Sequence, residues 1–177
     1  MVARIIGATL RDLSYIASNL RPDDREEVDC QFDDWTPALL ASIALRDHAY
    51  VVEVDGNPEA AVGASEARTG LWTAWSWGTR RMWRAVPRIT DIVRTVIIPD
   101  VLARGGHRAE ARAMVKNFSA HRWLKRMGAT ERCVLPGYGN GGEDFLLFDW
   151  TRTDVHHGHV PEAAHSQARS GGTGSDD

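Results

Sequence analysis

Three β-rich segments follow one another in the middle of the sequence with only short turns between them, and this order restricts the fold most strongly. The run AYVVEVDGNPEAAVGASE (residues 49–66) has two of these segments on either side of DGNPE, a pattern typical of a β-hairpin. The run GLWTAWSWG (residues 70–78) follows as a third strand. Because side chains alternate between the faces of a strand, one face of the third strand is expected to carry Leu71, Thr73, Trp75 and Trp77.

The segment before these strands predicts one strand and two helices. ARIIGA (residues 3–8) has the pattern of a strand, and residues 9–20 have the apolar spacing of a helix. Thr36-Pro37 predicts the start of a second helix, because proline is favoured at the first helical position. The acidic stretch between the two helices, RPDDREEVDCQFDDW (residues 21–35), is interpreted as irregular or only briefly helical.

The segment after the three strands predicts a long helical region, a strand, a short helix and a final hairpin. The main part of the long region is expected to start at Pro87 and to kink at Pro99. The expected bounds are 79–106 for the helical region, 108–115 for the strand, 117–130 for the stretch holding the short helix, and 130–135 and 144–150 for the last strands. The full order, β-α-α-β-β-β-α-β-α-β-β, predicts an α/β fold with a mixed sheet and helices on both faces.

The short helix has a clear amphipathic pattern in NFSAHRWLKRMGAT (residues 117–130). Ser119 is the expected N-cap, and Gly128 is expected to end the helix in a left-handed conformation. An apolar stripe at helical spacing contains Ala120, Trp123, Leu124 and Met127. Burial is therefore predicted for Trp123 and Leu124, and exposure for Arg122 and Arg126.

Composition indicates one domain followed by a polar tail. The chain has 177 residues, of which 43% are hydrophobic and 25% charged, enough for a single core. After Trp150 large apolar residues almost disappear, so the domain is expected over 1–150 and a disordered tail over 151–177. The tail contains HHGH (residues 156–159), but no Cys or acidic partner stands at a fixed spacing from it, so no metal site is expected.

Other features point to a cytoplasmic protein without a membrane partner. No apolar run approaches the length of a membrane span, and MVARIIGATLRD at the start lacks the long apolar segment of a secretion signal. The two cysteines, Cys30 and Cys133, have no paired metal spacing and are expected to be reduced.

The net charge of -3 hides a cationic middle segment. Residues 80–132 carry 13 basic and 4 acidic side chains, whereas residues 1–79 carry 6 basic and 13 acidic ones. Such a segment suits phosphate groups, nucleic acid or an acidic partner, and its ordinary explanation is a solvated helix face. Binding of nucleic acid ranks lowest, because the acidic ends of the chain oppose it.

The element order over residues 3–150 resembles that of the GNAT acyltransferase superfamily. Asn117, Ala120, Leu124 and Gly128 stand where its members often carry Asn, Ala, Tyr and Gly. NFSAHRWLKRMGA is also similar to a motif in short GNAT-like proteins of tailed bacteriophages, including an internal virion protein of podophages. Those proteins share the Trp-rich central strand and the long helix rich in Arg and Lys.

The resemblance implies acetyl-CoA or another acyl-CoA as cofactor and no metal. It assigns the pantetheine arm to the central strand and Asn117, and the phosphates to the segment after that strand. The cofactor-binding residues implied in this way are Trp75, Trp77, Gly78, Thr79, Arg80, Arg81, Arg84 and Asn117.

Two departures from the GNAT pattern concern the chemistry. Family enzymes bind pyrophosphate with a glycine-rich turn, because glycines let backbone N–H groups approach closely. In the matching stretch, WGTRRMWRAV, only Gly78 is available, and arginines that bind phosphate bidentately are the expected replacement. Leu124 stands where a tyrosine acid is common, and leucine cannot protonate a leaving thiolate.

The candidate catalytic residues are Tyr138, Glu66 and His121. Tyr138 lies in PGYGNGG, a loop that often borders the acceptor site in the family, and the alternative is an exposed turn aromatic. Glu66, like Glu53, is interpreted either as a base or as a solvated strand-end carboxylate. His121 is expected on the polar flank of its helix, at the surface.

Two functions remain open from the sequence. The first is an acyl-CoA-dependent N-acyltransferase that acts on a small-molecule or protein amine. The second is a non-catalytic GNAT-like bacteriophage protein that acts as a virion or assembly component and contacts other virion proteins. For a phage protein the expected location is the host cytoplasm or the virion.

Overall fold

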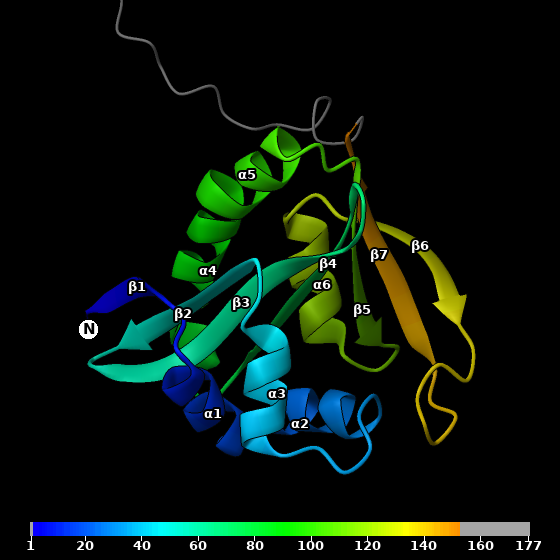
Figure 1. Cartoon of the computed structure of the whole chain (residues 1–177). Helices are drawn as coiled ribbons and strands as arrows, with labels where there is room; N and C mark the ends of the chain where they lie inside the picture. Colours follow the sequence, from blue (N-terminus) through cyan, green and yellow to red (C-terminus); the bar gives the residue numbers. More distant parts are fainter. Residues whose placement is uncertain (1, 153–177) are drawn as a thin grey trace, which may run out of the picture.

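The computed structural model describes residues 2–152, and its centre is a seven-stranded mixed sheet in the order β1-β2-β3-β4-β5-β7-β6 (Figure 1). Neighbouring strands are antiparallel except β4 and β5, which are parallel. The strands are β1 (Ala3–Gly7), β2 (His48–Val54), β3 (Asn57–Arg68), β4 (Leu71–Gly78), β5 (Arg108–Met114), β6 (Thr130–Leu135) and β7 (Phe145–Thr151).

Helices cover both faces of this sheet, as the element order predicted (Figure 1). One face carries α1 (Leu10–Ser18), α2 (Pro22–Asp29) and α3 (Pro37–Ala44). The other face carries α4 (Val86–Ile92), α5 (Ile98–Ala103) and α6 (Phe118–Arg126). The mixed α/β fold class is therefore confirmed.

The acidic stretch is better ordered than the sequence indicated. Residues 22–29 form α2, a helix of eight residues that begins with Pro22 at its first position. No side chain caps this helix and its mean hydropathy is low, so two common helix signals are missing, although Pro22 and the acids of the first turn are favourable. Two residues of this acidic helix are nevertheless buried, Asp24 and Val28.

The central hairpin is confirmed in its turn chemistry. Asp55 and Gly56 connect β2 to β3 with φ values of 52° and 85°, and a two-residue turn of this kind needs positive φ at both positions. Val54 and Asn57 then pair across the turn.

The three strands of this region divide the core between the two faces. Trp72 is 1% exposed and packs toward α4 with Ile89 and Ile97. Trp77, on the opposite face of β4, packs toward α1 with Leu13 and Ile16. Trp75 packs on the same side as Trp77, as the alternation along β4 predicted.

The strands β4 and β5 diverge after a short contact. Only Leu71–Thr73 of β4 pair with Arg108–Glu110 of β5. Beyond them β5 continues beside β7 as far as Met114, which pairs with Phe145, while β4 stays with β3. The middle of the sheet therefore opens into a gap with unpaired backbone on both sides.

The long helical region is interrupted near Pro99, as expected. A 3₁₀ turn (Met82–Arg84) comes first, α4 follows, and a π-helical turn (Val93–Ile97) separates α4 from α5. Proline has no amide N–H to donate, which disrupts regular hydrogen bonding at this point.

The helix α6 starts at a different cap from the one predicted. Asn117, not Ser119, is the N-cap, and its Oδ1 accepts a hydrogen bond of 3.2 Å from the Ala120 N–H. The Ser119 hydroxyl donates to the same oxygen at 2.9 Å, so it supports the cap. Asparagine is as good an N-cap as serine, and the sequence offered both.

The rest of α6 largely follows its pattern. Leu124 is buried, Arg122 and Arg126 are exposed, and Gly128 closes the helix with φ 83°. Trp123 is only half-buried, and its indole N–H donates to the Thr90 hydroxyl of α4 at 3.1 Å. This hydrogen bond fixes α6 against α4 on one side of the gap.

Candidate functional site

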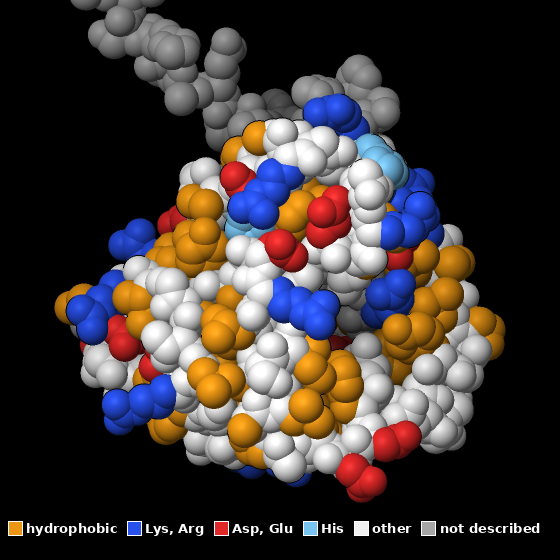
Figure 2. All heavy atoms as spheres, viewed as in Figure 1, with side chains coloured by type: hydrophobic (Ala, Val, Ile, Leu, Met, Phe, Trp, Pro, Cys, Tyr) orange, Lys and Arg blue, Asp and Glu red, His pale blue; other side chains and the backbone are white. Residues whose placement is uncertain are grey.

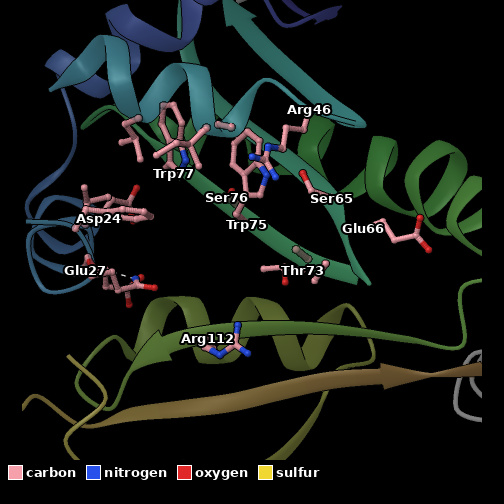
Figure 3. Close-up of a pocket in the computed structure, with 18 residues that line it drawn as sticks. Asp24, Glu27, Arg46, Ser65, Glu66, Thr73, Trp75, Ser76, Trp77 and Arg112 are labelled. Atoms are coloured by element: carbon pink, nitrogen blue, oxygen red, sulfur yellow. Dashed lines mark hydrogen bonds between the residues drawn. The ribbon is translucent and has the colours of Figure 1, made fainter. Parts of the chain in front are cut away.

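Two cavities lie on opposite faces of the sheet and meet at the gap between β4 and β5. The first, of about 410 Å³, lies between α4 and α6 and is called the α4/α6 cavity here. The second, of about 310 Å³, lies under α2 and α3 and is called the α2/α3 cavity (Figure 3). Six residues line both: Asp24, Glu27, Ala74, Trp75, Ser76 and Arg112. The residues at the gap therefore border both cavities.

The edge of β4 presents backbone hydrogen-bonding groups to this gap. Gly78 N–H donates to Asp24 Oδ2 at 2.8 Å, and Gly78 C=O accepts from Arg21 N–H at 2.9 Å, so both groups point away from β3. Because backbone groups alternate along an antiparallel ladder, Ala74 and Ser76 face the same edge. β5 has already diverged there, so these groups are not paired with it.

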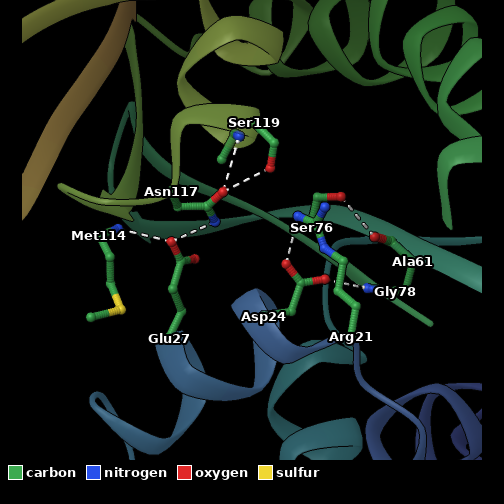
Figure 4. A network of polar contacts seen from close by, with 10 residues as sticks. Arg21, Asp24, Glu27, Ala61, Ser76, Gly78, Met114, Asn117 and Ser119 are labelled. Carbon is green, nitrogen blue, oxygen red and sulfur yellow. Dashed lines mark hydrogen bonds and ion pairs between the residues drawn. The ribbon is translucent and has the colours of Figure 1, made fainter. Parts of the chain in front are cut away.

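Two carboxylates on α2 bind the diverging strands, one strand each (Figure 4). Asp24 accepts from Gly78 N–H of β4, and Glu27 Oε1 accepts from Met114 N–H of β5 at 2.8 Å. The two residues are three positions apart, which places them on the same side of a helix. The helix α2 thus holds the open end of the gap between β4 and β5.

Glu27 also contacts the cap of α6. Asn117 Nδ2 donates to Glu27 Oε1 at 2.8 Å, while Asn117 Oδ1 caps the helix (Figure 4). Burial raises the pKa of Glu27 to about 7, although the hydrogen bonds from Asn117 and Met114 oppose the shift. Burial likewise raises the pKa of Asp24, against the effect of its partner Arg21. Glu27 can therefore gain or lose a proton near neutral pH.

The turn after β4 is closed by side chains and has little room. The Thr79 hydroxyl donates to Glu59, and Arg81 pairs with the second oxygen of Glu59 at 3.2 Å. A Cβ on Gly78 would lie 2.7 Å from Glu59 O and 2.8 Å from Met82 Cβ. The glycine here allows close packing of protein atoms, and its N–H is already bound by Asp24.

The arginines that line the α4/α6 cavity differ from those expected. Arg80 does line it, but Arg81 is paired with Glu59, and Arg84 stacks on the ring of Trp83 at 5.0 Å. Neither Arg81 nor Arg84 lines the cavity. Arg122 and Arg126, on the exposed face of α6, line it instead. The sequence pattern identified Arg122 and Arg126 only as exposed residues, because it could not show that the exposed face of α6 borders the cavity.

The other implied cofactor residues are divided between the two cavities. Thr79 and Asn117 line the α4/α6 cavity, and Trp75 lines both. Trp77 lines only the α2/α3 cavity, with its ring stacked on Trp75 at a centroid distance of 5.4 Å. Trp77 therefore lies on the other side of the sheet from the arginines.

The three catalytic candidates do not come together. His121 is buried, not exposed, and its Nε2 lies 2.8 Å from Met114 O, because α6 turns this side chain toward β5. Glu66 lines the α2/α3 cavity and accepts from Gly70 N–H at 2.8 Å. Tyr138 is 42% exposed, packs on Phe145 and lines neither cavity.

The comparisons with known proteins concern the fold. No family model and no curated protein matches the sequence. Ard1 from Thermoplasma volcanium matches with a TM-score of 0.66 and 12% identity, over 85% of this chain and 98% of that one. The ribosomal-protein-S18-alanine N-acetyltransferase from Escherichia coli matches with a TM-score of 0.61 and 14% identity, over 85% and 94%. A GNAT family acetyltransferase from Streptococcus pneumoniae matches with a TM-score of 0.59 and 11% identity, over 85% and 99%.

The chain has the GNAT fold. Its structural neighbours are N-acetyltransferases, and nothing in the comparisons links it to bacteriophage proteins. Identities this low establish the fold and leave the activity of this chain to be argued from its own residues.

Within this GNAT fold, the pair of carboxylates on α2 was not found from the sequence. A signal was present, because Asp24 and Glu27 follow Pro22 at helical spacing in RPDDREE. The acidic composition of this stretch concealed the signal, because the carboxylates of an acidic run are rarely buried.

Membrane and metal sites are judged on the described part of the chain. Over residues 2–152, none of the helices combines the length and hydrophobicity that crossing a bilayer requires. The same residues contain no group of three or more His, Cys, Asp or Glu side chains placed to hold a metal ion. The HHGH run and the rest of the expected tail after Arg152 lie outside the described residues.

Proposed function

We propose that this chain is an acyl-CoA-dependent N-acyltransferase whose acyl thioester lies in the α4/α6 cavity. The observation that carries the proposal is the diverging pair β4 and β5, which leaves an unpaired strand edge at a cavity of about 410 Å³. The structural neighbours are N-acetyltransferases, which favours this chemistry over others.

The strand edge fits the pantetheine arm of an acyl-CoA. That arm is an extended chain with two amides, and extended chains bind to open strand edges through main-chain hydrogen bonds. Ala74 and Ser76 offer those groups, and apolar side chains of Ile89, Val93 and Trp123 form the cavity wall. When bound there, the thioester supplies an activated acyl group and a thiolate as leaving group.

Three arginines from two sides of the cavity fit the phosphates. Arg80 follows β4, whereas Arg122 and Arg126 project from α6 across the cavity. Arginine binds phosphate bidentately, so these side chains would replace the backbone donors of a glycine-rich turn. Trp83 also lines the cavity, is 66% exposed and offers a ring for stacking on a nucleotide base.

The thiolate must obtain its proton without the family tyrosine. Leu124 occupies that position and is buried among apolar residues of α6, β5 and β7. It contributes packing and no proton transfer. The proposed reaction therefore relies on binding the thioester and the amine correctly and on removing a proton from the amine.

Calorimetric titration with acetyl-CoA tests the proposal. We expect binding by the wild type that weakens as salt is raised, because charge interactions are screened within about 10 Å at 0.1 M salt. Arg122→Ala/Arg126→Ala should bind at least about tenfold more weakly, as expected when bidentate charge-assisted contacts are lost. Lys125→Ala is the matched control, because Lys125 lies on the same helix, pairs with Glu131 and does not line the cavity.

The alternative from the sequence is a non-catalytic bacteriophage virion or assembly protein. The crowded turn at Gly78 and the buried Leu124 favour it, since both depart from the family pattern. If the wild type does not bind acetyl-CoA at millimolar concentration, the acyltransferase proposal is wrong and this alternative gains support.

A further inference from the structure

We infer that the α2/α3 cavity binds the acceptor, a primary amine on an apolar body, and that Glu27 receives the proton of that amine. This inference rests on the proposed function. An amine acceptor is already implied by the proposed N-acyltransferase; the apolar body of the acceptor, the cavity that binds it and the role of Glu27 are new here.

The α2/α3 cavity suits a small molecule with one polar end. Its volume of about 310 Å³ is in the range of small-ligand sites. Apolar side chains from α2, the loop after it, α3 and β4 form its walls: Val28, Phe32, Leu40, Ile43, Trp75 and Trp77. Asp24 and Glu27 lie together at one end, next to the gap between β4 and β5, and Glu66 lies at the opposite end (Figure 3). A ligand whose amine points toward α2 therefore places it where the two cavities meet.

Of the two carboxylates at that end, only Glu27 has an oxygen available. Asp24 uses Oδ1 for Arg21 at 2.7 Å and Oδ2 for Gly78 N–H. Glu27 accepts both of its hydrogen bonds on Oε1, from Met114 N–H and Asn117 Nδ2. Its Oε2 has no partner among the described hydrogen bonds and points toward Asp24 and the gap (Figure 4). The first oxygen fixes the carboxylate while the second faces the site.

The proton balance follows from this arrangement. An ammonium group in the cavity transfers one proton to Glu27 Oε2, which leaves a neutral amine and a protonated carboxyl group. The amine nitrogen then bonds to the acyl carbon as the C–S bond breaks, and the second nitrogen proton ends on sulfur as the thiol. No oxidant, reductant or metal is required.

The charged groups around Glu27 are compatible with this role. Asp24 and Arg21 face it from the α2 side, and Arg112 of β5 lines the same part of the cavity. Arg21 is paired with Asp24, and Arg112 is paired with Glu110 at 3.0 Å. Burial dominates and holds the pKa of Glu27 near the pH at which a general base works best.

The exposed surface near the cavity also bears on the acceptor. Figure 2 shows one face of the molecule, with hydrophobic side chains scattered over its lower half and the charged side chains of that half mainly toward the edges. Leu39 and Ile43 of α3 are exposed by 47% and 38%, and Ile43 also lines the cavity. An apolar acceptor body therefore meets apolar side chains from the surface inward.

The test compares two ligands of nearly equal shape by calorimetry: phenethylamine, which carries the amine, and 3-phenylpropionate, which carries a carboxylate. Titrations in two buffers of different ionisation heat also measure the protons released on binding. Near pH 7 about half of the Glu27 carboxyls are protonated. Binding of one phenethylamine should therefore release about half a proton on average. 3-Phenylpropionate should bind at least about tenfold more weakly, because it brings a second negative charge to the carboxylates.

Glu27→Gln should bind phenethylamine about tenfold more weakly and release no proton, whereas Glu26→Gln should retain the release. Glu26 is the matched control because it neighbours Glu27 on α2, pairs with Lys116 and lines neither cavity. The inference is overturned if phenethylamine does not bind, if Glu27→Gln releases as many protons as the wild type, or if the two ligands bind equally. Acetyl-CoA binding by the wild type is measured on the same sample. If the wild type does not bind acetyl-CoA, the proposed function is refuted. If it binds acetyl-CoA but any of the three contrary results is found, only the acceptor assignment is refuted.

Discussion

Glu27 connects three parts of the molecule through one oxygen atom. It accepts from the backbone of β5 and from the side chain that caps α6, and it belongs to α2. A carboxyl group in this position must lose most of its contact with water, which explains why its pKa lies above the ordinary value for glutamate. The same burial that makes the group useful as a base should reduce stability at high pH.

Replacing Glu27 with Gln tests this loss of stability at high pH. The folded pKa of about 7 lies above the ordinary 4.5, so the folded state holds the proton more tightly than the unfolded state. The stabilising contribution is therefore complete below the unfolded pKa and is lost as pH rises through about 7. Between about pH 5 and pH 8 the wild type should lose about 2–3 kcal/mol more unfolding free energy than Glu27→Gln. Denaturant unfolding at both pH values measures the difference, and parallel pH profiles would contradict it.

At the scale of the elements, the features that the sequence predicted correctly depend on residues close together in the chain. The β2–β3 turn follows from Asp55-Gly56, the start of α3 from Thr36, and the end of α6 from Gly128. Each of these is decided within a few positions. The function of α2 is decided by contacts of Asp24 across 54 positions and of Glu27 across 87, which no local pattern reveals.

The same limit explains two differences between the sequence predictions and the structure. Arg81 was assigned to phosphate because it follows β4 directly, but Glu59 on the neighbouring strand binds it. His121 was placed at the surface because it lies one residue past Ala120, on the polar flank of its helix, but the rotation of α6 turns it toward β5. Helical spacing gives the relative directions of side chains, and only tertiary packing gives the direction of the helix as a whole.

The turn after β4 supplies a prediction at this scale. A methyl group at position 78 would collide with Glu59 O and Met82, so Gly78→Ala should lower the unfolding free energy by about 1–3 kcal/mol. Gly7→Ala is the control, since a Cβ there meets nothing within 4 Å and the change should stay within about 1 kcal/mol. Equal stabilities of the two variants would show that the turn is looser than the structure has it.

At the scale of the whole molecule, a single sheet separates the two cavities. The sequence predicted the fold class and the order of the strands along the chain. The end of the domain at Trp150 stays a prediction. Chain termination after Arg152 should leave the melting temperature nearly unchanged, because residues 153–177 contain few apolar side chains to bury. Thermal unfolding of the full and shortened chains measures this, and a drop of many degrees would show that the domain needs the removed segment.

The central claim is that the open edge of β4 binds the acyl-CoA arm, and hydrogen exchange of individual backbone amides tests it most directly. With acetyl-CoA at saturating concentration, exchange should slow at Ala74 and Ser76, whose N–H groups face the gap. Trp72 is the internal control, because it already pairs with β5 and should change little. Slower exchange at Ala74 and Ser76 alone supports the account. Acetyl-CoA binding that leaves both amides unchanged would contradict it, because the ligand would then lie elsewhere.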